Sequence, residues 1–379
     1  MTANEQERAV VRGLRGVAAA RTRISFVDPL GSLYYSGYNI DVLVNNSTYE
    51  EVIYLLLNNK LPTKNELTDL KSELYSSMRL PKEVVERIRN SSKGSHPMEI
   101  LRTEISHLGE FDPEPDETSD AANKKRAIRI IAKVPTVISF LHRNRLEENA
   151  VAPLREFSFA ENFLYMFRGK TADTQEKNAM ERYMILHADH GLNASTFAAR
   201  VTAGTGSDLY SAITSAVGTL KGFFHGGASE RVMKMLYEIN SLDEVEQYIQ
   251  SMLDDKKKIM GFGHRVYKAE DPRSKHLREL AESICYQKDT WEIYNKCKKI
   301  EETVHAKKGI FPNVDFYAAL VMHALGIPRD FFTAFFAASR VSGWVAHTLE
   351  QYTDAVLIRP TSEYVGEYGR KFIPIEERN

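Results

Sequence analysis

Hydrophobic positions along the chain recur mainly at helical spacing. Three segments, 48–56, 63–74 and 241–253, begin with Ser or Thr, carry Glu three residues later and continue into an apolar stripe. This order is typical of a capping box at a helix N-terminus. Ser207 can cap a further helix, whose apolar face is formed by Tyr210, Ile213, Val217 and Leu220. The pattern predicts a mainly α-helical protein.

Signals for β-strands are few and lie near the N-terminus. The stretch RISFVDPLGSLYYSGYNI (23–40) contains short β-rich runs interrupted by Asp28-Pro29, Gly31 and Gly37. This pattern predicts a small β-meander. Prolines are expected to punctuate the helical segments at Pro62, Pro81, Pro97 and Pro135.

Composition excludes some classes of function. The chain has 379 residues, enough for two domains or for a large domain with a smaller one attached. It is 43% hydrophobic and 27% charged, the mix of an ordinary soluble globular protein. Because the net charge is -1, the overall balance favours neither nucleic acid nor a membrane surface as a partner, and any anion site must be local.

No targeting or metal signal stands out. The N-terminal stretch MTANEQERAVVRG lacks the apolar core of a signal peptide, and no apolar run approaches the ~18 residues of a membrane span. Cys285 and Cys297 fit no zinc pattern and suit a reducing compartment. We therefore expect a cytoplasmic protein without a metal site.

The segment HADHGLNAS holds His187 and His190, which would share one face of a helix. A metal site is one interpretation, but no cysteine or carboxylate cluster completes it, and Gly191 ends the helical pattern. A substrate-facing His190 near a helix end, with Asn193 beside it, is favoured. A histidine of the core or of a helix cap is the alternative.

His225 precedes Gly226-Gly227 and a strongly amphipathic segment. It is therefore expected at or just before a helix N-terminus, where the helix dipole disfavours the imidazolium form. A neutral ring there can donate a hydrogen bond. The alternative is an ordinary histidine in a turn.

The stretch KKKIMGFGHRVYK (256–268) combines basic residues with Gly261 and Gly263 around Phe262 and places His264 directly after them. Glycines are unfavourable inside a helix, so a tight turn is predicted. Basic residues and bare backbone N–H groups suit a phosphorylated ligand, although neither a P-loop nor a dinucleotide fingerprint is present. A solvated run of charges is the alternative.

The C-terminal third adds a carboxylate and arginines. Asp315 lies in a Pro-Asn-x-Asp turn before an apolar helix, where a simple helix cap is the alternative role. Arg340 sits within an apolar helical segment, so it must be paired or face an anion. With His225 and His264, these residues suit proton abstraction next to a carbonyl, with donors for the enolate oxygen.

The ordered motifs HADHGLNAS, SAITSAVGTLKGFFHGG, KKKIMGFGHRVYKAEDPRSK, FPNVDF, SRVSGWVAH and IRP together resemble the citrate synthase family. The likeness is to the short type of bacteria and archaea, a group that includes 2-methylcitrate synthases. It implies a mainly α, citrate-synthase-like two-domain homodimer. Residues 1–224 and 326–379 would form the large domain and residues 225–325 an inserted small domain, with the active site in the cleft between them.

The resemblance also implies roles. Asp315 is similar to the base that deprotonates the acyl-CoA, His225 to the histidine that stabilises the enolate, and His264 to the one that polarises the oxaloacetate carbonyl. His190, Arg273, Arg340 and Arg359 resemble the substrate ligands, with Arg359 reaching into the partner subunit's site. Lys258, Ile259, Met260, Gly261 and Phe262 resemble the loop around CoA. A CoA thioester is the implied co-substrate, with no permanently bound cofactor.

Two departures from the family pattern concern specificity. Phe223-Phe224 precede His225, where the family usually has Pro followed by a small or aliphatic residue. Gly191 stands where many members have Glu. Phe224 is expected to affect the acyl pocket. The implied reaction uses acetyl-CoA. The alternatives are propionyl-CoA, giving 2-methylcitrate, and a non-catalytic helical paralogue, which would be expected to lack Asp315 or a histidine.

Overall fold

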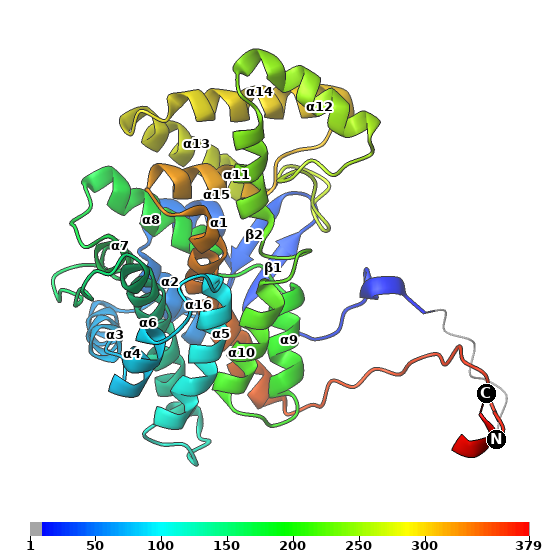
Figure 1. Ribbon diagram of the computed structural model, residues 1–379. Helices are drawn as coiled ribbons and strands as arrows, with labels where there is room; N and C mark the ends of the chain where they lie inside the picture. The colour runs from blue at the N-terminus through cyan, green and yellow to red at the C-terminus, as the bar shows by residue number, and fades with distance from the viewer. Residues whose placement is uncertain (1–9, 379) are drawn as a thin grey trace.

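The computed structural model describes residues 10–378 as a mainly helical body with one small sheet (Figure 1). Met1 to Ala9, part of the N-terminal stretch considered for a signal peptide, and Asn379 lie outside this range. The first ten α-helices are α1 (Ile40–Asn46), α2 (Tyr49–Asn58), α3 (Lys64–Ser77), α4 (Lys82–Arg89), α5 (Pro97–Leu108), α6 (Asp120–Arg145), α7 (Phe159–Arg168), α8 (Thr174–His187), α9 (Ala194–Ala203) and α10 (Leu209–Leu220). The others are α11 (Ala228–Glu238), α12 (Val245–Asp254), α13 (Pro272–Gln287), α14 (Trp291–Lys308), α15 (Val314–Ala324) and α16 (Phe332–Asp354).

The predicted β-meander is confirmed. Strands β1 (Ser25–Asp28), β2 (Ser32–Tyr35) and β3 (Tyr38–Asn39) pair antiparallel in sequence order. Tyr35 is fully buried, and its hydroxyl donates a 2.9 Å hydrogen bond to the carbonyl of Asp189. The meander is thereby anchored to the segment that follows α8.

The capping signals located two helices correctly and two imprecisely. Thr48 and Thr63 both form complete capping boxes, at the starts of α2 and α3. The other two predicted caps were wrong. Asp208 caps α10 in place of Ser207, and Ser241 makes no cap because a short 3-10 turn, Leu242–Glu244, precedes α12.

Pro135 does not interrupt a helix, contrary to the prediction. It lies inside the 26-residue helix α6 and is itself buried. Proline in a helix interior costs about 3 kcal/mol. Helix α6 offsets this cost because apolar residues along its length, from Ala127 to Leu141, are buried against α16, α7 and α3.

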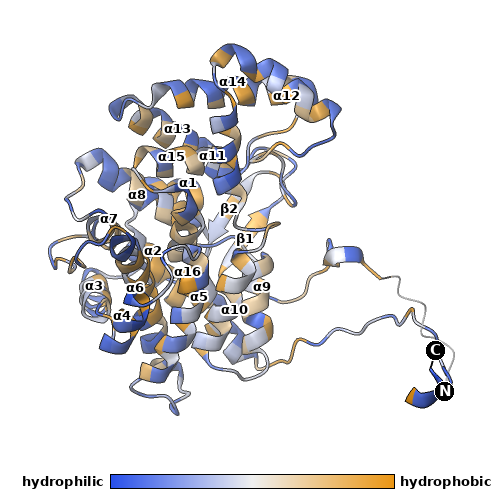
Figure 2. Cartoon of the chain, in the orientation of Figure 1, coloured by the Kyte–Doolittle hydropathy of each residue, from blue (hydrophilic) through white to orange (hydrophobic). Residues whose placement is uncertain are grey.

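Helix α16 forms the centre of the body. Its residues from Phe332 to Thr348 are all buried, and it packs against α6, α9, α10, α8 and α2. Colouring by hydropathy shows apolar residues gathered along these central helices (Figure 2). Arg340 lies in the middle of this helix, so the fold places a cation within an apolar core.

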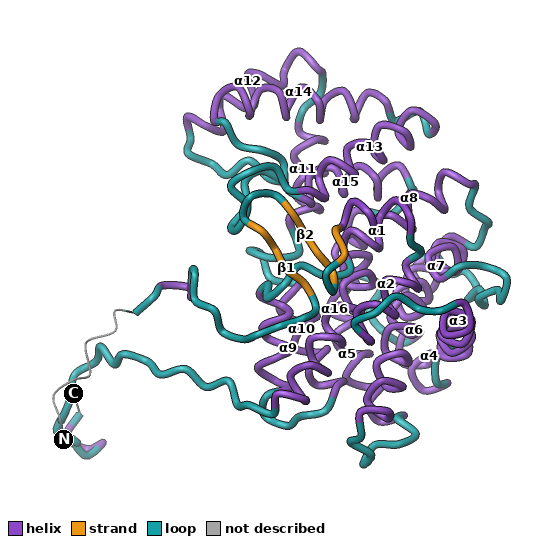
Figure 3. Tube along the Cα trace, turned by 180° about the vertical axis from the view of Figure 1, so that it is seen from behind, coloured by secondary structure: helices purple, strands orange, loops and turns teal. Residues whose placement is uncertain are grey.

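Helices α11 to α15 gather at one end of the molecule (Figure 1). Within this group α15 packs on α13 and α11, and α12 packs on α14. Helices α13 and α15 also contact α8, so side chains of both groups meet there. Segments 10–22 and 356–378 extend away from the helical body (Figure 3). Among residues 10–378, no helix is long and apolar enough to cross a membrane.

Candidate active site

The predicted glycine turn is present and lies along the segment 311–313. Gly261 and Gly263 have φ of +80° and +74°, in the left-handed region that favours glycine. The N–H of Asn313 donates to the Gly261 carbonyl at 2.8 Å, and the Asn313 amide donates to the Gly263 carbonyl at 3.0 Å. A Cβ on Gly261 would come within 2.8 Å of the Phe316 ring. This close approach joins the loop of His264 to the start of α15.

The tautomer of His264 is set by backbone groups. The N–H groups of Val266 and Tyr267 both donate to Nδ1 at 3.0 Å. Nδ1 is therefore the unprotonated nitrogen, and a neutral ring carries its proton on Nε2. Burial, assisted by the positive charge of Arg273, lowers the pKa of His264 to about 4. His264 thus presents a neutral N–H donor at neutral pH.

His190 lies directly beside His264. The two rings pack edge to face with centroids 5.2 Å apart, and Nε2 of His190 is 3.1 Å from the hydroxyl of Tyr267. Burial, with Arg273 and His264 nearby, holds the pKa of His190 well below its usual range. His187 belongs to the core instead, because its ring stacks on Tyr183 and its Nδ1 bonds the Tyr183 carbonyl.

Two buried arginines supply positive charge to the site: one is paired with a carboxylate, and the other keeps a donor without a partner. Arg273, in the first turn of α13, is paired with Asp271 through contacts of 3.0 Å and 2.7 Å. Arg340 is 1% exposed and donates through Nε to the His187 carbonyl at 2.6 Å. Its Nη2 is buried and has no hydrogen-bond partner among the described residues. Because a buried cation is costly without compensation, this free donor suits an anionic ligand.

His225 lies two residues before Gly227, the N-cap of α11, as the sequence predicted. Its Nε2 accepts from the N–H of Ser195 at 3.2 Å and is 2.8 Å from the Ser195 hydroxyl. A neutral ring therefore carries its proton on Nδ1. Burial lowers the pKa of His225 to about 4, with a smaller effect of Arg340. Desolvation, and not the helix dipole expected from the sequence, is thus the main reason for the neutral ring.

Asp315 is not the cap of α15, because Asn313 fills that role. The side chain of Asn313 accepts from the N–H of Asp315 at 3.1 Å. The Asp315 atom Oδ1 is buried and has no hydrogen-bond partner in the described structure. Burial raises the pKa of Asp315 to about 6, although Arg273 and Arg340 act to lower it. The arrangement is a carboxylate with a pKa near neutral and an unused acceptor atom.

The structure brings most of the predicted site residues together. The charges of Arg273 and Arg340 act on Asp315 and His190, and Arg340 also acts on His225, so these groups share one electrostatic environment. Arg359 is exposed and lies outside the helices and strands, in segment 356–378.

In the predicted CoA loop, Ile259, Gly261 and Phe262 are buried, Met260 is half-buried and Lys258 is exposed. The inward-facing side chains of Ile259 and Phe262 pack in the core, where Phe262 lies edge-on to Phe316 with ring centroids 4.7 Å apart. The backbone, Lys258 and the half-buried Met260 are therefore what this loop offers to a ligand.

Sequence reasoning missed several residues that complete the site. Asp271 was not singled out, although an Asp-Pro pair before a helix is a recognisable cap signal, and its side chain accepts from the N–H of Arg273 at 3.0 Å. Tyr267 and Ser195 were also missed. The contact of Tyr267 with His190 and that of Ser195 with His225 join distant parts of the chain, so no local signal could have found these two contacts.

Phe223 and Phe224 do not form part of the core, being 64% and 97% exposed. The guanidinium of Arg231 lies 3.9 Å from the centre of the Phe223 ring. Both rings therefore lie on the surface, next to His225 in the sequence.

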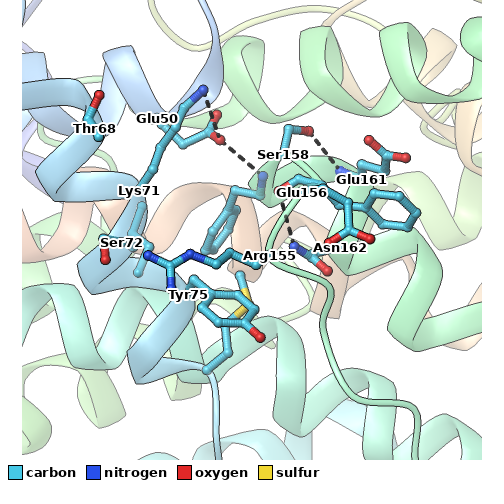
Figure 4. Close-up of a pocket in the computed structure, with 14 residues that line it drawn as sticks. Glu50, Thr68, Lys71, Ser72, Tyr75, Arg155, Glu156, Ser158, Glu161 and Asn162 are labelled. Carbon is cyan, nitrogen blue, oxygen red and sulfur yellow. Dashed lines mark hydrogen bonds and ion pairs between the residues drawn. The ribbon is translucent and has the colours of Figure 1, made fainter. Parts of the chain in front are cut away.

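The described residues contain no group of three His, Cys, Asp or Glu side chains that could hold a metal ion. A cavity of about 480 Å³ lies between α3 and the segment 155–162 (Figure 4). Its lining includes Glu50, Lys71 and Arg155 but none of the predicted site residues, so it is separate from the histidine cluster.

Comparison with known proteins identifies relatives over nearly the whole chain. Residues 13–361 match the family model described as citrate synthase, C-terminal domain. Citrate synthase 2 of Bacillus subtilis is 48% identical over 97% of this chain and 99% of its own length. A 2-methylcitrate synthase of Corynebacterium glutamicum is 40% identical over 97% of this chain and 98% of its own length.

The fold also matches a solved structure. Citrate synthase of Thermoplasma acidophilum, determined as a ternary complex with carboxymethyl coenzyme A and oxaloacetate, has a TM-score of 0.92 and 34% identity. The match covers 97% of this chain and 99% of that chain.

Proposed function

Since the chain belongs to the citrate synthase family, we propose that it condenses the acetyl group of acetyl-CoA with oxaloacetate and hydrolyses the resulting thioester to citrate and CoA. The observation that carries this proposal is the free carboxylate of Asp315 in one electrostatic environment with neutral histidines and buried arginines. A carbon acid next to a thioester requires a base, a donor to the enolate oxygen and an electrophile held close by.

In the first step, Asp315 takes a proton from the methyl group of acetyl-CoA. Its pKa of about 6 leaves it mostly ionised at neutral pH while keeping it more basic than an ordinary aspartate. His225 donates from Nδ1 to the thioester oxygen, where negative charge develops. The neutral state of His225 matters here, because it leaves the enolate as a nucleophile instead of protonating it.

In the second step, the enolate carbon attacks the ketone of oxaloacetate. His264 donates from Nε2 to the ketone oxygen, since its Nδ1 is already occupied by two backbone N–H groups. Arg273 and Arg340 bind the carboxylates of oxaloacetate, and His190 contributes a further contact. His264 then assists water in hydrolysing the thioester, which releases CoA.

The proposal extends to the co-substrate and the assembly. The loop from Lys258 to Phe262 contacts CoA through its backbone, and no permanently bound cofactor takes part. The small domain, residues 225–325, closes on the large domain, residues 1–224 and 326–379, and shields the enolate from water. Two subunits form a homodimer, in which Arg359 contacts substrate in the partner's site. The extended, exposed position of residue 359 supports this assignment. A cytoplasmic location accords with these substrates.

Release of CoA tests the proposal directly. With oxaloacetate and acetyl-CoA, the purified protein is expected to release thiol at a rate that depends on both substrates, as followed with a thiol reagent. Citrate in the product mixture identifies the reaction. Thiol release that does not depend on oxaloacetate would indicate a simple thioesterase and contradict the proposal.

A second candidate function is 2-methylcitrate synthesis from propionyl-CoA. The 2-methylcitrate synthase relative, at 40% identity over nearly the full length, supports it. The same assay with propionyl-CoA in place of acetyl-CoA distinguishes the two functions, because the methylated product differs in mass.

A further inference from the structure

One residue connects the two histidines on the proposed oxaloacetate side of the site. Tyr267 is 6% exposed and follows His264 by three positions in the loop. Its backbone N–H donates to Nδ1 of His264 at 3.0 Å, and its hydroxyl is 3.1 Å from Nε2 of His190. Its ring also lies against the His264 ring, with centroids 4.5 Å apart.

Each contact constrains a different property. The backbone hydrogen bond fixes the tautomer of His264, as any residue at position 267 except proline would. The ring contact limits rotation of the His264 side chain. The hydroxyl is specific to tyrosine, and it gives the His190 ring a hydrogen bond that fixes the orientation of that ring.

The loop that carries Tyr267 is held from the opposite side by the β1–β2 turn. The N–H of Lys268 donates to the carbonyl of Pro29 at 3.0 Å. A Cβ on Gly31 would lie 3.3 Å from both Ala269 and the Glu270 carbonyl, so the turn packs closely on the loop. Tyr267 is therefore fixed both by this backbone contact and by its burial.

We propose that Tyr267 is a positioning residue that holds His190 and His264 at a fixed separation for binding of a 2-oxo dicarboxylate. This inference rests on the proposed function and adds a residue to that site. The hydroxyl acts through His190, whereas the ring acts through His264. Loss of the hydroxyl alone should therefore weaken oxaloacetate binding more than it affects the acyl-CoA, whose reacting group is assigned to Asp315 and His225.

The variant Tyr267→Phe tests the hydroxyl because it removes a single atom and keeps both the ring and the backbone. We expect the Kd for oxaloacetate, measured by calorimetry without acyl-CoA, to rise about tenfold, the effect of one lost hydrogen bond in a desolvated site. The KM for acetyl-CoA at saturating oxaloacetate should change less than about twofold. The variant Tyr267→Leu also removes the ring contact, so it should lower kcat in addition.

A control is Tyr352→Phe, which removes the hydroxyl of a half-buried tyrosine that donates to the Ser207 carbonyl at 2.8 Å, away from the histidines. The control should leave the oxaloacetate Kd unchanged. An unchanged Kd in folded Tyr267→Phe would overturn the role of the hydroxyl, and equal losses for both substrates would indicate a general structural effect. Calorimetry needs no turnover, so it decides this point even if the wild type releases no CoA, which would contradict the proposed function instead.

Discussion

Replacing Asp315 with Asn tests the role of the carboxylate without changing the shape of the side chain at the start of α15. Asparagine keeps the shape of the side chain at the second position of α15 but cannot accept a proton at neutral pH. If Asp315 is the base, kcat should fall by at least about 100-fold, the lower range for loss of a positioned general base. Stability should not fall, since burial raises the pKa of Asp315 and the ionised carboxylate therefore costs the folded state stability at neutral pH.

The pH dependence of the wild-type rate provides a second, independent test of Asp315 as the base. With a pKa of about 6, Asp315 is ionised to roughly one-tenth at pH 5 and nine-tenths at pH 7. His225 and His264, with pKa values of about 4, stay neutral over this interval and add no opposing change. At substrate concentrations well below KM, the rate should therefore rise about tenfold from pH 5 to pH 7.

Asp41 provides a control for the helix cap alone, because it is exposed and contacts His276 whereas Oδ1 of Asp315 is buried. Asn39-Ile40-Asp41 starts α1 as Asn313-Val314-Asp315 starts α15, with the Asn39 side chain accepting from the N–H of Asp41 at 2.8 Å. Asp41→Asn should leave kcat close to the wild-type value, because Asp41 is not among the proposed site residues. Steady-state release of CoA, with circular dichroism to verify folding, measures both variants. Near-wild-type turnover by folded Asp315→Asn would refute the assignment, and a flat rate between pH 5 and 7 would refute the pKa argument.

Three further predictions concern stability, assembly and acyl choice. Burial and the nearby charge of Glu50 raise the pKa of Glu181, so the folded state favours the protonated carboxyl. The folded state therefore loses stability as the pH rises above about 4.3, the ordinary pKa of a glutamate. Glu181→Gln should therefore raise the melting temperature more at pH 8 than at pH 5, and an equal effect at both would contradict this. Mixing inactive Asp315→Ala and Arg359→Ala subunits should restore partial activity if Arg359 acts in the partner's site; demonstrated exchange without recovery would exclude that role. Both acyl-CoAs should be used with kcat/KM values within about 200-fold of each other, and Phe224→Leu should shift this ratio without lowering the melting temperature. An unchanged ratio would remove Phe224 from the acyl pocket.

Local chemistry explains which parts of the fold were predictable. The capping boxes at Thr48 and Thr63 are complete within four residues, so the sequence contains the whole interaction. The turn at Gly261 and Gly263 was equally predictable, because glycine is the residue that adopts positive φ without steric cost. Pro135 was mispredicted because long-range burial of α6 outweighs its local cost.

The candidate site also combines features that local sequence predicts with features that depend on long-range packing. Asp315 and His225 were recognisable from adjacent turn and helix signals together with the family resemblance. The free state of the Asp315 carboxylate was not, because it depends on Asn313 taking the cap and on burial by other elements. The contact between Tyr267 and His190 spans 77 positions, so only the folded chain reveals it.

The arrangement of charge suggests that the arginines do more than bind substrate. Both Arg273 and Arg340 lower the pKa of Asp315, against the larger effect of burial. Oxaloacetate would bring two negative charges into the same environment, and these alone would raise the pKa of Asp315 further and remove the base at neutral pH. Arg340 retains an unpartnered Nη2, which allows it to bind a carboxylate without giving up a protein contact. In the proposed reaction, the two arginines therefore compensate the charge of the substrate and so keep Asp315 ionised for proton abstraction.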